Sequence, residues 1–148
     1  MFPIGEQPDF IRDIADIKDN TSKEIAIDHH TKNIEILTSL TEIETVWIYW
    51  VKQKEFELII KSINPKHLYV YGAQIPDLSS LEHLTNAESI CLQWNTKALS
   101  LWDLSKNTLL KRLGIEDFKR LEIIEEVSRC QWLEELTLAG GVVSNTLK

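Results

Sequence analysis

The chain has 148 residues, of which 43% are hydrophobic, and this is enough for one domain with its own core. Its formal net charge of −7 argues against nucleic-acid binding, which needs a basic surface to displace counterions. No stretch approaches the roughly 18 apolar residues of a membrane helix, so we expect no membrane span.

The two cysteines, Cys91 and Cys130, are too few for a disulfide scaffold, and we expect both to be free thiols in a reducing compartment. Residues 1–6, Met-Phe-Pro-Ile-Gly-Glu, have neither the basic start nor the apolar run of a signal peptide. These features predict a cytoplasmic location. The acidic surplus is uneven, because residues 1–50 hold ten Asp/Glu against four Lys/Arg.

In chain order, the first predicted element is a short amphipathic helix after Pro8. Asp9 is its expected N-cap, and apolar residues follow at positions 10, 11, 14 and 17. Residues 1–22 are expected to cover the first end of a repeat domain that spans 23–148, since a terminal repeat cannot leave its core exposed. The alternative is a loosely ordered tail.

A short apolar-x-apolar strand then recurs along the chain. Successive copies begin 21, 22, 22, 23 and 23 residues apart. A period in the low twenties indicates that each repeat contributes one strand and one return segment. The copies are Ile25/Ile27, Val46/Ile48, Leu68/Val70, Ile90/Leu92, Leu113/Ile115 and Leu136/Leu138.

The return segments differ in their apolar spacing. Residues 75–84 place apolar side chains three apart, which suits tight 3₁₀-type winding, and the same spacing in 34–43 suits a 3₁₀-like or a helical return. Residues 54–63 have a helical pattern that Asn64-Pro65 ends, because the residue before proline is pushed out of the helical region. Residues 117–130 are long enough for about three helical turns.

The third repeat carries the most specific pattern, Gln74-Ile75-Pro76-Asp77-Leu78-Ser79-Ser80-Leu81-Glu82-His83-Leu84-Thr85-Asn86. It resembles the I-x-D-L-S-x-L-x-x-L-T-N return of the leucine-rich-repeat family, in its short bacterial, internalin-like class, and the resemblance covers residues 24–141. It implies an α/β solenoid: a right-handed horseshoe with six short parallel strands on its concave face and 3₁₀ or α returns on its convex face. Asn95 stands where the family places an asparagine ladder, but His30, Val51, Ala73, Phe118 and Gly141 occupy the other equivalent positions.

In a solenoid of this kind, the strand side chains between the core positions would line the concave face, because alternate residues of a strand face opposite ways. All three tyrosines fall there together with Trp47, and an exposed aromatic patch usually marks an interaction site. Two alternatives are that the rings merely stabilise the sheet or that the N-terminal tail folds over them. The predicted partner-binding residues are Trp47, Tyr49, Tyr69, Tyr71, Asp28, His67, Gln93 and Glu116.

We expect no catalytic residue, no metal and no cofactor. Nucleophile elbows, Walker loops, dinucleotide fingerprints, His-Glu-x-x-His motifs and paired Cys-x-x-Cys motifs are all missing from the sequence. Cys91 and His67 lie on neighbouring strands and could form a nucleophile–base pair, which keeps a cysteine-dependent enzyme as a minor alternative. His29-His30 is a histidine pair without a third ligand at a suitable spacing.

The sequence therefore predicts a protein-binding module whose acidic, aromatic concave face docks another protein, and we expect that partner to be basic. By analogy with small acidic proteins of this kind, the more specific hypothesis is an immunity protein that inhibits a toxin, and the alternative is a generic scaffold. The expected sixth strand, 134–140, is followed by only eight residues. An uncovered edge there predicts a homodimer joined near residues 133–147. The alternatives are that the chain is a piece of a longer repeat array or that Val142, Val143 and Leu147 fold back to cover the edge.

Overall fold

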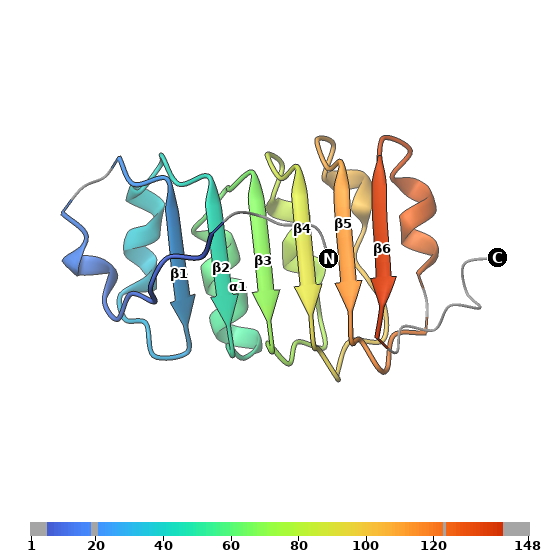
Figure 1. Ribbon diagram of the computed structural model, residues 1–148, viewed down its shortest axis with the longest axis horizontal. Helices are drawn as coiled ribbons and strands as arrows, with labels where there is room; N and C mark the ends of the chain where they lie inside the picture. The colour runs from blue at the N-terminus through green and yellow to red at the C-terminus, as the bar shows by residue number, and fades with distance from the viewer. Residues whose placement is uncertain (1–5, 19–20, 123, 141–148) are drawn as a thin grey trace.

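A computed structural model describes residues 6–18, 21–122 and 124–140. They form a single open sheet of six parallel strands in which chain order is also spatial order (Figure 1). Each strand is joined to the next by a return segment that lies behind the sheet. The strands are β1 (Glu24–Asp28), β2 (Thr45–Tyr49), β3 (His67–Tyr71), β4 (Ser89–Gln93), β5 (Arg112–Glu116) and β6 (Glu135–Ala139).

The strands pair in register, so that equivalent positions of successive repeats stand side by side. Leu68 of β3, for example, lies between Val46 of β2 and Ile90 of β4. These core positions are fully buried in the first five strands, and the strand pattern is thereby confirmed. In β6, Leu136 and Leu138 are only partly buried, since this strand pairs with β5 alone among the described residues.

The return segments follow their apolar spacing. One is a helix, α1 (Gln53–Lys61), which buries Phe56, Ile59 and Ile60 as predicted. The 3₁₀ winding predicted for 75–84 is also confirmed, and of the two forms expected for 34–43 the 3₁₀ form is the one present. The 3₁₀ helices are η1 (Ile14–Asp16), η2 (Ile34–Ser39), η3 (Ser79–His83), η4 (Leu104–Lys106) and η5 (Glu125–Arg129).

The prediction of about three helical turns in 117–130 is wrong. In the described stretches 117–122 and 124–130, η5 is the one helical element, and the amide of Leu121 donates to the carbonyl of Phe118 at 3.2 Å, an i to i−3 bond. Apolar residues at 118, 121, 124 and 127 step by three, so 3₁₀-type winding turns them all toward the core.

The amphipathic helix predicted after Asp9 is also wrong. Instead, Phe10 forms a bridge with Ala26, and the amide of Ile11 donates to the carbonyl of Ala26 at 3.0 Å. Within residues 6–18 the only helical turn is η1, which is capped by Asp13 rather than by Asp9 and buries Ile14 in the core. Pairing with the outer edge of β1 satisfies backbone groups that a separate helix would have left open.

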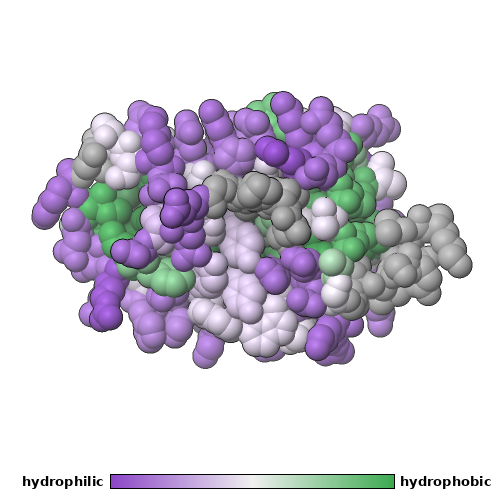
Figure 2. Space-filling model, in the orientation of Figure 1, coloured by the Kyte–Doolittle hydropathy of each residue, from purple (hydrophilic) through white to green (hydrophobic). Residues whose placement is uncertain are grey.

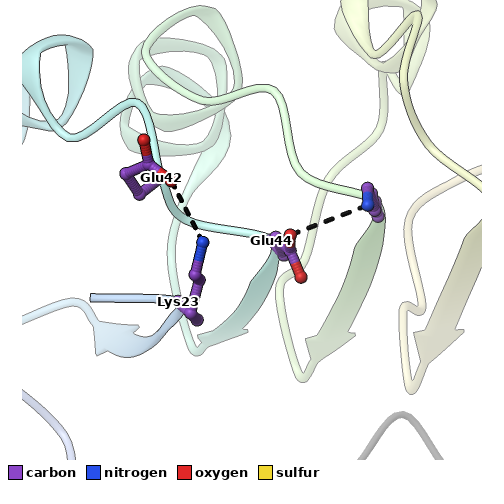
Figure 3. A network of polar contacts seen from close by, with 4 residues as sticks. Lys23, Glu42 and Glu44 are labelled. Carbon is purple, nitrogen blue, oxygen red and sulfur yellow. Dashed lines mark hydrogen bonds and ion pairs between the residues drawn. The ribbon is translucent and has the colours of Figure 1, made fainter. Parts of the chain in front are cut away.

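Charges alternate in sign at the position just before each strand. Backbone bonds join these residues from repeat to repeat; the amide of Lys66, for example, donates to the carbonyl of Glu44 at 2.8 Å. Glu44 also forms an ion pair with Lys66, and Lys23 forms one with Glu42 (Figure 3). Both pairs are exposed, so each adds at most about 1 kcal/mol, and a slip by one repeat would place like charges together. The column is Lys23, Glu44, Lys66, Glu88, Lys111 and Glu134.

Asn95 makes the inter-repeat bonds expected of its position. Its buried amide nitrogen donates to the carbonyl of Ile75 at 2.8 Å, and its side-chain oxygen accepts from the amides of Lys97 and Ala98. At two other positions of this column, Val51 and Ala73 are buried apolar residues that cannot form such bonds. The Asn95 side chain therefore joins the backbone after β4 to the backbone after β3.

Candidate functional site

The front face of the sheet, the one turned away from α1 and the 3₁₀ helices, is largely covered at its first strands. Trp47 is only 4% exposed, and Ala26 and Cys91 on the same face are fully buried. The chain before η1 passes in front of β1 toward β2 (Figure 1). The prediction that Trp47 belongs to an exposed aromatic patch is therefore wrong, because the front face at this point is an interior surface.

The hydroxyl groups of two of the three tyrosines form hydrogen bonds within the chain. The Phe10 ring meets Tyr49 edge-on at 5.0 Å, and the Tyr49 hydroxyl donates to Gln7 Oε1 at 2.6 Å. The Tyr69 hydroxyl donates to Gln93 Oε1 at 2.5 Å. Burial raises the pKa of Tyr49, and it raises the pKa of Tyr69 to about 12, so both hydroxyls stay protonated donors. The alternative in which the N-terminal tail folds over the rings holds for Tyr49.

The polar residues predicted for the site are spread across the sheet. Asp28, at the end of β1, accepts a bond from the amide of His30 at 2.8 Å and so closes a turn. His67 lies at the start of β3, where burial lowers its pKa. Glu116 lies in β5, where it pairs in register with Gln93 of β4. The two acidic residues predicted for the site thus lie on β1 and β5 and do not surround one spot.

An aromatic cluster lies instead where β2, β3 and β4 end, and we define it as Trp50, Tyr71 and Trp94. The ring centroids are 5.2 Å apart for Trp50 and Tyr71, 5.4 Å for Trp50 and Trp94, and 6.0 Å for Tyr71 and Trp94. Trp50 is 44% exposed and Trp94 is 36% exposed. In Figure 2, near-white surface of intermediate hydropathy, the class of Trp and Tyr, runs down the middle strands to their lower ends.

The backbone that carries this cluster is in an unusual conformation. Trp50 and Trp94 have φ angles of 63° and 59°, in the left-handed region. This conformation extends the backbone hydrogen bonding of the sheet one residue past the strand end. The amide of Trp50 donates to the carbonyl of Tyr71 at 3.0 Å, and the amide of Trp94 donates to the carbonyl of Glu116 at 2.9 Å. The fold therefore demands a left-handed residue after these strands, but it does not demand tryptophan.

The equivalent residue of β3 is Gly72, which adopts the left-handed conformation without steric cost. A Cβ atom at position 72 would lie 2.7 Å from Cε3 of Trp50. Because residue 72 has no side chain, the Trp50 indole can cross the third repeat and reach Trp94 in the fourth. Gln74 supports the same region, since its Nε2 donates to the carbonyl of Trp94 at 3.1 Å.

The ring contacts of the cluster roughly offset the backbone strain at its two tryptophans. A left-handed non-glycine residue costs about 1–2 kcal/mol, so the two tryptophans together cost about 2–4 kcal/mol. Three aromatic contacts contribute about 0.5–1.5 kcal/mol each, which roughly offsets that cost. Folding alone therefore gives no reason for two exposed tryptophans at positions that glycine would fill without strain.

The hydrogen-bonding state of the tryptophans points the same way. The indole of Trp102 donates to Asn107 Oδ1 at 2.7 Å, and that of Trp132 donates to the carbonyl of Asn107 at 2.9 Å. Among the described residues, neither Trp50 nor Trp94 donates its indole N–H to any acceptor. The cluster thus presents ring surface and two available donors to the outside.

The remaining candidate chemistry finds no support in the geometry. Cys91 is fully buried, and burial raises the pKa of its thiol to about 12, opposite to the activation that a nucleophilic cysteine needs. Cys130 is likewise a buried free thiol. Over the described ranges, no group of three or more His, Cys, Asp or Glu side chains is placed to hold a metal ion.

Comparison of the chain with protein-family models, with curated proteins and with solved structures finds no match. Among residues 6–18, 21–122 and 124–140, no helix combines the length and the apolarity needed to cross a membrane. Because the comparisons give no match, the function of the chain must be inferred from the geometry of the site.

The sequence does contain a signal for the cluster. Trp50, Gly72 and Trp94 are spaced 22 residues apart, in step with the repeat, and each directly follows a strand. The predicted binding residues were chosen by alternation within the strands, which selects Trp47 and does not consider the residue after each strand. An aromatic–glycine–aromatic series at one repeat position is the pattern that would have found them.

Proposed function

We propose that this chain is a leucine-rich-repeat protein that acts as a protein-binding module, with the aromatic cluster as the centre of its contact surface. In-register parallel strands at a period of 21–23 residues, each followed by a return behind the sheet, support the family assignment. The binding role rests on one observation above all: Trp50 and Trp94 are exposed and held in a strained backbone conformation.

Exposed tryptophan and tyrosine on a rigid support are typical of binding hot spots, where few residues carry most of the affinity. A rigid aromatic surface also loses little conformational entropy when a partner docks. The net charge of −7 favours a basic partner and fast association at low salt. Inhibition of a basic toxin domain and a scaffold role are the two forms of this proposal.

The test is affinity capture from the native cell with the wild-type chain and with a Trp50→Gly/Trp94→Gly variant. Glycine suits the left-handed positions, so the variant should keep its fold while losing the rings. Trp132→Phe is the matched control, since Trp132 is exposed but lies outside the cluster.

We expect a partner that the wild type and Trp132→Phe capture equally and that the double variant loses. Equal capture by all three proteins would refute the cluster as the binding site. The activity of the captured protein separates an inhibitor from a scaffold.

A further inference from the structure

A hollow of about 310 Å³ opens beside the aromatic cluster. It is lined by Tyr71, Trp94, Asp117 and Lys119. The planes of the Tyr71 and Trp94 rings meet at 43°, so the two rings form a wedge on one side of the hollow. Asp117 directly follows β5, at the same repeat position as Trp94.

The Asp117 carboxylate is held in place but has no partner in the part of the chain that the structure describes. Its backbone has a φ of 56°, and its amide donates to the carbonyl of Ala139 at 3.0 Å, which fixes the residue at the strand end. Its side chain lies against Gly140, where an added Cβ would collide with it. Among the described residues, no hydrogen-bond donor or cation pairs with this carboxylate, which leaves it as the acceptor in the hollow.

We propose that this hollow receives an arginine side chain of the partner protein. A guanidinium is flat and cationic, so it stacks on tryptophan and tyrosine rings while its N–H groups bond a carboxylate in the same plane. The wedge supplies the ring faces and Asp117 supplies the carboxylate. This inference rests on the proposed function, and it names the chemistry of the partner at the centre of the contact.

Lys119 carries a positive charge at the rim of the hollow and opposes a bound cation. It is exposed, so water and salt screen much of that repulsion. Its presence gives the proposal a specific consequence: removal of the Lys119 charge must strengthen arginine binding. A neutral occupant, such as a proline-rich segment stacked on the rings, would not respond in this way.

The experiment follows the five indole N–H signals of the ¹⁵N-labelled chain by NMR while blocked tripeptides are added. The probes are Gly-Arg-Gly, Gly-Lys-Gly and Gly-Gln-Gly, with a blocked tetraproline as the competing class. We expect the arginine peptide to shift the Trp94 and Trp50 signals saturably, with a dissociation constant in the range of about 1–10 mM. The Trp102 and Trp132 signals, whose N–H groups are already bonded, should not move.

Three variants make the test decisive. Asp117→Asn keeps the shape and tolerates the left-handed conformation, and it should weaken arginine binding about threefold or more, whereas Lys119→Gln should strengthen it by a similar factor. Trp94→Gly should abolish the shifts of Trp50. An arginine affinity unchanged in Asp117→Asn, or a tetraproline peptide that binds as tightly as the arginine peptide, would overturn the proposal.

The outcomes for this inference and for the proposed function are separable. If cellular capture depends on the cluster but the arginine peptide does not bind, the protein-binding function is supported and the arginine site is refuted. If the arginine peptide binds as expected but the double glycine variant captures the same partner, the hollow is an arginine site and the cluster is not the docking centre.

Discussion

Gly72→Ala tests whether the cluster depends on the missing side chain at position 72. The alanine must adopt the φ of 69° that Gly72 has, which costs a non-glycine residue about 1–2 kcal/mol. Its methyl group is the new atom at this position. It also lies 2.7 Å from Cε3 and 2.8 Å from Cζ3 of Trp50, so the indole must move. Moving it removes the edge-on contacts with Tyr71 and Trp94, worth about 0.5–1.5 kcal/mol each. The expected loss of unfolding free energy is about 2–5 kcal/mol.

A double-mutant cycle with Trp50→Gly isolates the collision. In the Trp50→Gly background the methyl group meets no indole, so only the backbone cost of about 1–2 kcal/mol should remain. The coupling between the two substitutions should therefore be about 1–3 kcal/mol. Unfolding free energies come from urea denaturation followed by circular dichroism, and the Trp94 indole signal in NMR reports the displaced ring.

Gly140→Ala is the control for this cycle. Gly140 has a similar φ of 63°, but a methyl group there meets Asp117 rather than Trp50. Its cost should be the same in both backgrounds to within about 0.5 kcal/mol. The account of the cluster is refuted if Gly72→Ala also shows no coupling to Trp50→Gly, since the indole would then not cross the third repeat.

Trp47→Ala should lower unfolding free energy by about 3–5 kcal/mol, because Trp47 is 4% exposed and its removal leaves a cavity; a loss below about 1 kcal/mol in urea denaturation would show that the front face is open. Leu68→Ala, a core control, should cost about 2–5 kcal/mol in the same assay. Asn107→Ala should cost about 2 kcal/mol or more, since the buried Trp102 indole loses its acceptor and the carbonyls of Leu81 and Leu84 each lose one of two donors; near-wild-type denaturation would contradict that network. The Cys91 thiol stays protonated in the folded chain up to about pH 12 but ionises near pH 9.0 when unfolded, so its contribution to stability is complete below pH 9.0 and is lost as the pH rises toward 12. Melting temperatures across this range should fall less steeply for Cys91→Ala, and rapid reaction of the native thiol with a disulfide reagent at pH 8 would argue against its burial.

The repeat pattern determined the sheet. A strand recurs every 21–23 residues, and parallel strands joined by returns of nearly constant length stack in chain order with equivalent residues side by side. The core side of every strand followed from the alternation of apolar positions, as Leu68 and Ile90 illustrate. The steps of three in 75–84 predicted 3₁₀ winding correctly, whereas the length of 117–130 suggested a helix that its own spacing of three rules out.

What only the tertiary structure decided was which aromatic side chains reach the surface. Alternation within a strand places Trp47 on the front face, but whether that face meets water depends on residues far away in sequence, such as Phe10 beside β1. The contact between Trp50 and Trp94 depends on backbone φ angles and on the space above Gly72 in the repeat between them. Periodicity fixes which residues are neighbours, because it is a property of spacing along the chain. Exposure and ring contact depend instead on packing between residues that are distant in sequence. There the backbone conformation of one residue decides which side chains can touch.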